Sequence, residues 1–220
     1  HMEFRVFGKK FGALRESFWY YFNAAKRAWV AGNAYWAWRF LSRATHYLAD
    51  LGHPAHVKVF PYRMLFRILR HLKESFTVFS AAHNGHEVYA QARFRQGFMP
   101  FKEALVDGAR LGSPHHGNFR YELERYCLNA KKQLTPIYTT LLHDFGDEFV
   151  HAYDKFDPAK EFGQDASQAV LSAEKEAHDI LFRDPNNPGL QVLDRITTDL
   201  LREVGRMLGF LFATVKTEFV

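Results

Sequence analysis

The sequence predicts an all-α protein folded as a compact bundle of several helices. Apolar residues recur at three- and four-residue spacing along almost the whole chain, which is the pattern of amphipathic helices. Glycine, proline and asparagine separate these stretches, and no stretch alternates apolar and polar residues as a half-buried strand would. The chain has 220 residues, of which 47% are hydrophobic, so it can bury a substantial core in one domain over residues 3–220.

The breakers divide the chain into successive expected helices. Gly32, Gly52, Pro54 and Asn84-Gly85 are expected to end or interrupt helices, and Pro136 is expected at the first position of one. Helices are expected over residues 11–31, 34–51, 61–80, 84–95, 99–110, 118–133, 136–155, 164–183 and 190–217.

The most informative motif is Thr45-His-Tyr-Leu-Ala-Asp-Leu-Gly-His-Pro-Ala-His56. His46 and Asp50 are four residues apart, so a helix places both side chains on one face. The helix is expected to stop just beyond Asp50, and the chain can then double back to bring His56 towards the same point. Imidazole and carboxylate are ligands of zinc and related divalent ions. The motif therefore predicts a metal site, although histidines hydrogen-bonded within a core would fit the same spacing.

The segment from Phe40 to His56 resembles the hallmark of the zinc-dependent phospholipase C family, which includes single-strand-specific zinc nucleases. That hallmark reads His-Tyr-Leu-Gly-Asp and then Gln-Pro-x-His. Ala49 replaces its glycine and His53 replaces its glutamine, while the three candidate ligands keep their spacing. The aromatic segment over residues 20–38 is similar to the paired helices that precede the family motif.

The resemblance implies a bundle that binds one to three zinc ions. Asp50 would bridge two metal positions, and His46 would complete one of them. His56 and Glu124 would hold the other. His53 is a further candidate for binding metal or substrate.

Glu124 lies in the segment 118–126, where family members read Phe-His-x-x-x-Glu. Arg120 replaces that histidine and cannot ligate a metal, so it would pair with Glu124 or bind a phosphate group. His115 and His116, just before this segment, are candidates for the missing imidazole.

Two departures from the family limit what the resemblance implies. The family uses further histidine and aspartate ligands upstream of the hallmark, and residues 3–44 contain neither residue type. Either these ligands lie outside the sequence, or the site is rebuilt from other residues, or catalysis is lost. Residues 57–117 form an expected insertion, in which the amphipathic segment 66–72 would be a packing helix, a lid or a membrane-surface helix.

The favoured function is a metal-dependent phosphoester hydrolase, in which a zinc-activated water attacks a phosphodiester. Its substrate would be a phospholipid head group or a nucleic acid, with peripheral membrane contact as a further expectation. The alternatives are a non-catalytic or incomplete metal-binding module of the same fold, and a bundle whose histidines bind no metal. Neither the oligomeric state nor the substrate follows from the sequence.

The remaining histidines are expected to be structural or exposed. His143, Asp147 and His151 recur every four residues with Asp154 a turn later. Such a series could bind a metal or form an exposed ladder on one helix face, and we favour the ladder. His83 and His86 flank Gly85 and are expected at an exposed turn.

Composition narrows the setting of the protein. The net charge of +5 suits an anionic partner but is common among proteins. The single cysteine, Cys127, excludes an intramolecular disulfide framework. No apolar run approaches the ~20 residues of a membrane span. We therefore expect a soluble protein, either cytoplasmic or exported with its signal removed.

Overall fold

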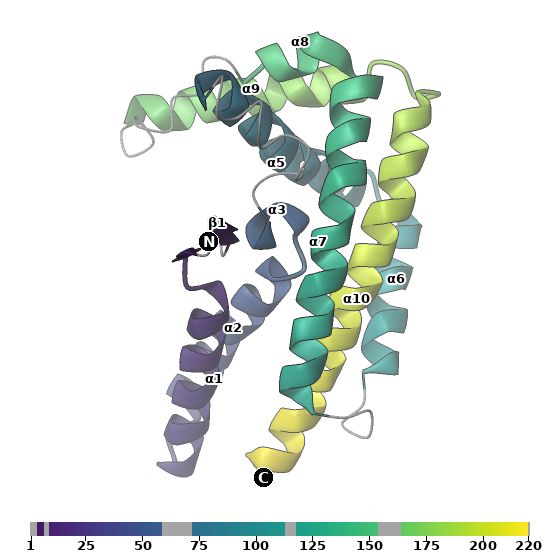
Figure 1. Ribbon diagram of the computed structural model, residues 1–220. Helices are drawn as coiled ribbons and strands as arrows, with labels where there is room; N and C mark the ends of the chain where they lie inside the picture. Colours follow the sequence, from purple (N-terminus) through teal and green to yellow (C-terminus); the bar gives the residue numbers. More distant parts are fainter. Residues whose placement is uncertain (1–3, 7–8, 59–71, 113–117, 154–163, 220) are drawn as a thin grey trace. The chain divides into compact units, whose positions relative to one another are not determined.

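The computed structural model describes residues 4–6, 9–58, 72–112, 118–153 and 164–219. Figure 1 shows the elements in their order along the chain. They are β1 (Phe4–Val6), β2 (Lys9–Phe11), α1 (Leu14–Val30), α2 (Ala34–Asp50), α3 (Pro54–Val57), α5 (Leu72–Arg95), α6 (Met99–Leu111), α7 (Phe119–Asp144), α8 (Gly146–His151), α9 (Gln164–Leu181) and α10 (Pro188–Glu218). The predicted all-helical class is confirmed, and a short antiparallel hairpin of β1 and β2 precedes the helices.

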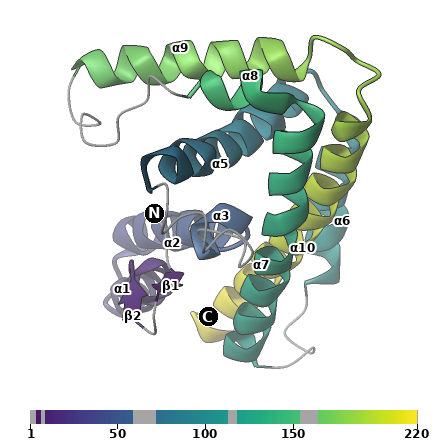
Figure 2. The ribbon, with the colours of Figure 1, turned by 45° about the horizontal axis from the view of Figure 1, so that its top comes forward.

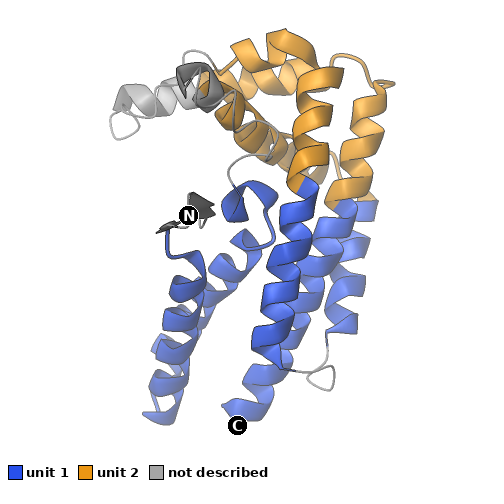
Figure 3. Ribbon diagram, in the orientation of Figure 1, with its two compact units in different colours: residues 1–59, 100–133, 198–220 blue, residues 60–99, 134–197 orange. Residues whose placement is uncertain are grey.

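The chain forms two compact units (Figure 3). Unit 1 comprises residues 1–59, 100–133 and 198–220, and unit 2 comprises residues 60–99 and 134–197. The helices α7 and α10 are each divided between the two units, α7 after residue 133 and α10 after residue 197. The insertion expected at residues 57–117 does not coincide with either unit, because its second part, from residue 100, belongs to unit 1.

The α1–α2 hairpin of unit 1 follows from its turn residues. Gly32 adopts a positive φ of 75°, which a residue with a side chain rarely adopts. The Asn33 side chain then accepts a hydrogen bond from the Trp36 backbone N–H at 3.3 Å and caps α2. The buried face of α2 consists of Ala37, Leu41, Ala44 and Leu48, spaced as one helical stripe.

Close helix packing in unit 1 depends on glycines of α6 and α10. A Cβ on Gly108 would overlap the backbone carbonyl of Arg202, and a Cβ on Gly205 would overlap that of Leu105. Gly112 and Gly209 are equally crowded by backbone atoms of the opposite helix. These two helices therefore approach so closely that only glycine fits at their contact.

Unit 2 is built around large aromatic side chains. Tyr89 of α5, Phe149 of α8 and the following Tyr153 are almost completely buried. Figure 2 shows α5, α8 and α9 of this unit lying close together, in agreement with their contacts. Arg93 pairs with the partly buried Asp194 of α10 at 2.8 Å and closes this core.

Two of the expected breaks are wrong. The helix α5 continues through Asn84-Gly85. Gly85 does not end the helix; it stands there because the Phe149 ring leaves no room for a Cβ. The helix α7 continues through Pro136, which sits inside it rather than at its start. The expected end of α2 at Asp50 and the break near residue 97 are confirmed.

None of the described helices combines the length and the apolar character that a bilayer crossing needs.

Candidate metal centre

The end of α2 and the short helix α3 bring the motif side chains together within unit 1. His46 and Asp50 lie one turn apart at the C-terminal end of α2. Pro54 occupies the first position of α3, so the chain turns at Gly52-His53 and returns at once. His56 belongs to α3 and is buried. The expected return of the chain towards Asp50 is thus present, with a helix where we expected a loop.

Asp50 lies between two imidazoles. Its Oδ2 atom is 3.5 Å from Nε2 of His46, and its Oδ1 atom is 3.8 Å from Nδ1 of His56. These separations exceed a normal hydrogen bond. Two ligand atoms that share a tetrahedral zinc ion lie about 3.4 Å apart, since each is ~2.1 Å from the metal. The arrangement therefore has the spacing of a ligand set.

His53 adds a third imidazole to this group. Its ring centroid lies 4.6 Å from that of His56, and their ligand nitrogens are within 4.8 Å of each other. The Nδ1 atoms of both rings and Oδ2 of Asp50 are buried. Only His46 is substantially exposed, with 46% of its side chain accessible, so the group is open on the His46 side. This donor set of imidazole and carboxylate fits zinc.

Tyr126 of α7 packs against the turn at Gly52 that joins the ligands of α2 to those of α3. A Cβ on Gly52 would overlap the Tyr126 ring and hydroxyl. The same hydroxyl donates a hydrogen bond to the Leu48 carbonyl at 3.2 Å. Burial raises the pKa of Tyr126 well above its usual value, so the hydroxyl remains a donor. Gly52 is thus required for close packing and has no positive φ of its own.

Positive charge lies near the group. Partial burial lowers the pKa of Lys58, and the nearby Lys131 charge lowers it further. Lys58 follows α3 directly, two residues after His56. Two ammonium groups close enough to affect each other favour an anion between or beside them.

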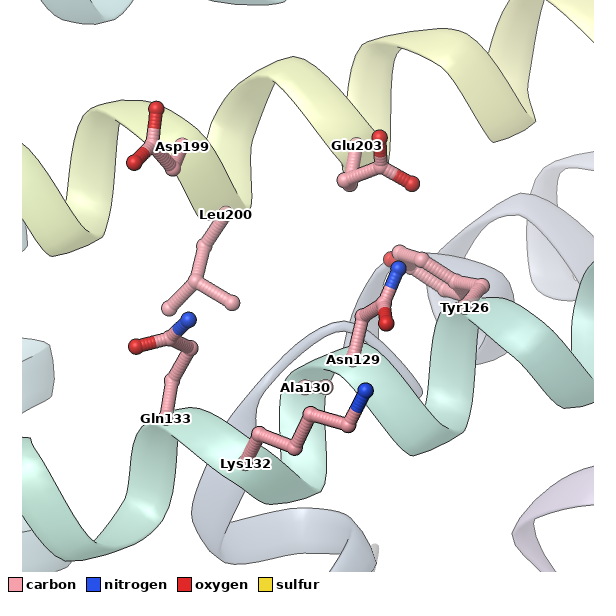
Figure 4. Close-up of a pocket in the computed structure, with 8 residues that line it drawn as sticks. All are labelled: Tyr126, Asn129, Ala130, Lys132, Gln133, Asp199, Leu200 and Glu203. Carbon is pink, nitrogen blue, oxygen red and sulfur yellow. The ribbon is translucent and has the colours of Figure 1, made fainter.

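A cavity of about 170 Å³ within unit 1 has Tyr126 among its lining residues. Asn129 and Lys132 of α7 face Asp199 and Glu203 of α10 across it (Figure 4). Glu203 is also bound by Arg206 at 2.9 Å. Its lining combines apolar side chains with these charged and amide groups, and Tyr126, which contacts the turn at Gly52, is among the lining residues.

Unit 2 holds a second pair of candidate ligands that the sequence analysis missed. Nε2 of His83 lies 3.4 Å from Oε1 of Glu87, one turn later on α5. Burial raises the pKa of Glu174, and the neighbouring Glu87 charge adds to it, so another carboxylate is near. The spacing His-x-x-x-Glu could have indicated this pair, but Gly85 led us to expect a turn between the two residues.

Glu124 has a different partner from the expected metal. Its carboxylate accepts hydrogen bonds from the Arg15 guanidinium at 2.6 and 2.5 Å and is half exposed. Arg120 lies over the Trp19 ring at 5.5 Å and does not pair with Glu124. No described contact joins either residue to the group at Asp50. His115 and His116 lie outside the residues that the structure describes.

Two expectations about the other histidines are corrected. His86 is buried, not exposed, and its Nε2 atom lies 3.0 Å from the Thr197 hydroxyl. His83 is only partly exposed. His143 and His151 are exposed as expected, but α7 ends at Asp144 and α8 begins at Gly146, so they do not share one helix. Asp154 and most of segment 66–72 lie outside the described ranges.

Comparison with known proteins gives no relative. No family model, curated protein or solved structure matches the chain.

Proposed function

We propose that the protein is a metal-dependent phosphoester hydrolase that uses zinc bound by His46, Asp50 and His56. The observation that carries the proposal is the position of the Asp50 carboxylate, 3.5 Å and 3.8 Å from the two imidazoles. A hydrophobic core would not need two histidines on one carboxylate at that spacing. His53, adjacent to His56, is a fourth candidate ligand.

The chemistry of this donor set suits hydrolysis of a phosphoester. Bound zinc lowers the pKa of a coordinated water and neutralises charge on phosphoryl oxygens. The exposed His46 side gives a substrate access, while the buried His56 fixes the turn. Lys58, which follows α3 two residues after His56, would supply positive charge for the phosphoryl group. The resemblance to zinc-dependent phospholipase C supports the same class, with a phospholipid head group or a nucleic acid as substrate.

The proposal also assigns His83 and Glu87 to metal binding. They have the His-x-x-x-Glu spacing that follows the hallmark in the resembling family, and their side chains lie 3.4 Å apart. Both residues belong to unit 2, and the proposal no longer includes Glu124 as a ligand, because its carboxylate is bound to Arg15.

Hydrolysis of bis(4-nitrophenyl) phosphate by protein stripped of metal and reloaded with zinc tests the proposal. We expect zinc-dependent turnover that falls at least a hundredfold in Asp50→Asn and in His56→Ala. The control is His178→Ala, because His178 matches His46 in side-chain exposure (46%) and also lies beside a carboxylate, that of Asp179. Turnover that survives both ligand variants would contradict the proposal.

A non-catalytic metal-binding module is the second candidate. It is favoured by the absence of histidine and aspartate from residues 3–44, where the resembling family places further ligands. Zinc bound without turnover, and lost in Asp50→Asn, would support this candidate over the enzyme. Absence of zinc binding would exclude both.

A further inference from the structure

The α1–α2 hairpin concentrates aromatic residues at an exposed tip. All four tryptophans of the chain, Trp19, Trp29, Trp36 and Trp38, belong to this hairpin. Tyr35 is 63% exposed, Trp36 is 48% exposed and Trp38 is 55% exposed. Every residue from 30 to 36 is exposed. An isolated exposed aromatic residue is ordinary, but consecutive ones at the end of a hairpin form a patch.

Between residues 17 and 49, which include the tip of the hairpin, the charges have one sign. Residues 17–49 contain four cationic residues, Lys26, Arg27, Arg39 and Arg43, and no aspartate or glutamate. Lys26 pairs with Glu218 at 2.9 Å. The three arginines are exposed, and none forms an ion pair within the described part of the chain. The hairpin therefore presents net positive charge.

One face of α2 carries both features. Tyr35, Arg39 and Arg43 lie opposite the buried stripe that holds α2 against its neighbours, and the exposed Trp36 flanks them. Trp36 stacks on Phe40 with ring centroids 5.7 Å apart, and the Arg39 guanidinium lies 5.8 Å from the Tyr35 ring centroid. These contacts hold the Tyr35 and Trp36 rings and the Arg39 guanidinium at the same surface, and Arg43 is exposed one turn further along α2.

An apolar groove of about 230 Å³ adjoins the tip within unit 1. Trp29, Trp38, Leu41, Phe212 and Phe219 line it, and Lys216 is its one cationic lining residue. Apolar side chains thus extend from the tip into the groove.

We propose that the tip of the α1–α2 hairpin is a docking surface for an anionic lipid bilayer, defined by Tyr35, Trp36, Trp38, Arg39 and Arg43. Tryptophan and tyrosine favour the interface between lipid head groups and hydrocarbon, because one part of each ring system is apolar and another is polar. Arginines beside them gain energy from anionic head groups. Residues 17–49 contain no aspartate or glutamate, so no acidic side chain of this segment repels the anionic head groups.

Sedimentation with lipid vesicles tests this surface, using phosphatidylcholine vesicles with and without 30% phosphatidylglycerol. We expect binding to the anionic vesicles, a blue shift of tryptophan emission, and quenching by brominated lipid. Tyr35→Ala/Trp36→Ala and Arg39→Gln/Arg43→Gln should each weaken binding roughly tenfold or more. Tyr121→Ala is the matched control, because Tyr121 is 69% exposed on α7 of the same unit and should change binding less than twofold.

The outcomes separate this surface from other partners and from the proposed hydrolase. No binding to anionic vesicles, or binding that both hairpin variants leave unchanged, would overturn the proposal. Tight binding to a single-stranded oligonucleotide without vesicle binding, or self-association that the Trp36 variant abolishes without vesicle binding, would overturn it as well. Asp50→Asn should bind vesicles like the wild type, because the docking surface does not require the metal. A melting temperature within a few degrees of the wild type would show that the variants are folded.

Discussion

The Oδ1 atom of Asp50, at the end of α2, lies 3.8 Å from the Nδ1 atom of His56, although five residues separate the two in the sequence. Pro54 and Gly52 produce this contact, since the first starts α3 immediately and the second lets the turn approach Tyr126. The position of His56 beside Asp50 therefore depends on this turn, and substitutions in the turn should change the stability of the protein.

Gly52→Ala should destabilise the protein by about 1–3 kcal/mol, the usual cost of overpacking a filled site. The added methyl group would overlap the Tyr126 ring and hydroxyl. Tyr126→Phe removes the hydroxyl and with it part of the overlap, together with one buried hydrogen bond worth about 1 kcal/mol. Urea unfolding of both single variants and the double variant should show a double-mutant cost smaller than the sum. Strict additivity would show that Tyr126 does not crowd the turn.

Gly108→Ala should also destabilise, although the same change in an open helix stabilises by about 0.5–1 kcal/mol. The new Cβ would meet the backbone carbonyl of Arg202, which cannot move aside like a side chain. Glu103→Ala on the exposed face of the same helix is the control and should change the unfolding free energy by less than about 0.5 kcal/mol. An increase in stability for Gly108→Ala would contradict the close approach of α6 and α10.

Burial lowers the pKa of His86 from 6.5 to about 4. The unfolded state therefore binds more protons between these pH values, and His86 costs stability as the pH falls from 6.5 to 4. The loss over this window is on the order of 3 kcal/mol. This loss of stability should be absent in His86→Gln and should persist in His178→Gln, in which the substituted histidine is exposed. Denaturant unfolding in the presence of a chelator measures this, and identical pH profiles for wild type and His86→Gln would refute the assignment.

Glu124→Gln should leave zinc binding unchanged, because the Glu124 carboxylate is engaged by Arg15. Loss of this half-exposed ion pair should cost at most ~1 kcal/mol. Zinc titration by calorimetry and thermal unfolding measure the two effects. A drop in zinc stoichiometry in this variant would restore Glu124 as a ligand.

The sequence predicts the helices and the first ligand group because both depend on local signals. Apolar spacing marks α2, and Gly52 with Pro54 marks its end. Gly85 and Pro136 mislead for a tertiary reason: Gly85 makes room for the Phe149 ring, and α7 tolerates Pro136 within a long packed helix. Because a break was expected at Gly85, His83 and Glu87 were not recognised as a pair. Their spacing places both side chains on one face only if α5 is continuous.

Burial and ion pairing could not be predicted from local patterns. His86 resembles a turn residue in the sequence, yet it lies in a core and meets Thr197 from a helix more than a hundred residues away. Glu124 fits a family motif in spacing, but a distant Arg15 binds it. Both outcomes depend on long-range contacts.

The metal centre at Asp50 can be tested by equilibrium dialysis against zinc, with bound metal counted in wild type, Asp50→Asn and the exposure-matched His178→Ala. We expect at least one tightly bound zinc ion per chain in wild type and in His178→Ala, and a loss of at least one in Asp50→Asn. Equal zinc content in all three proteins, or none in the wild type, would contradict a metal centre at Asp50.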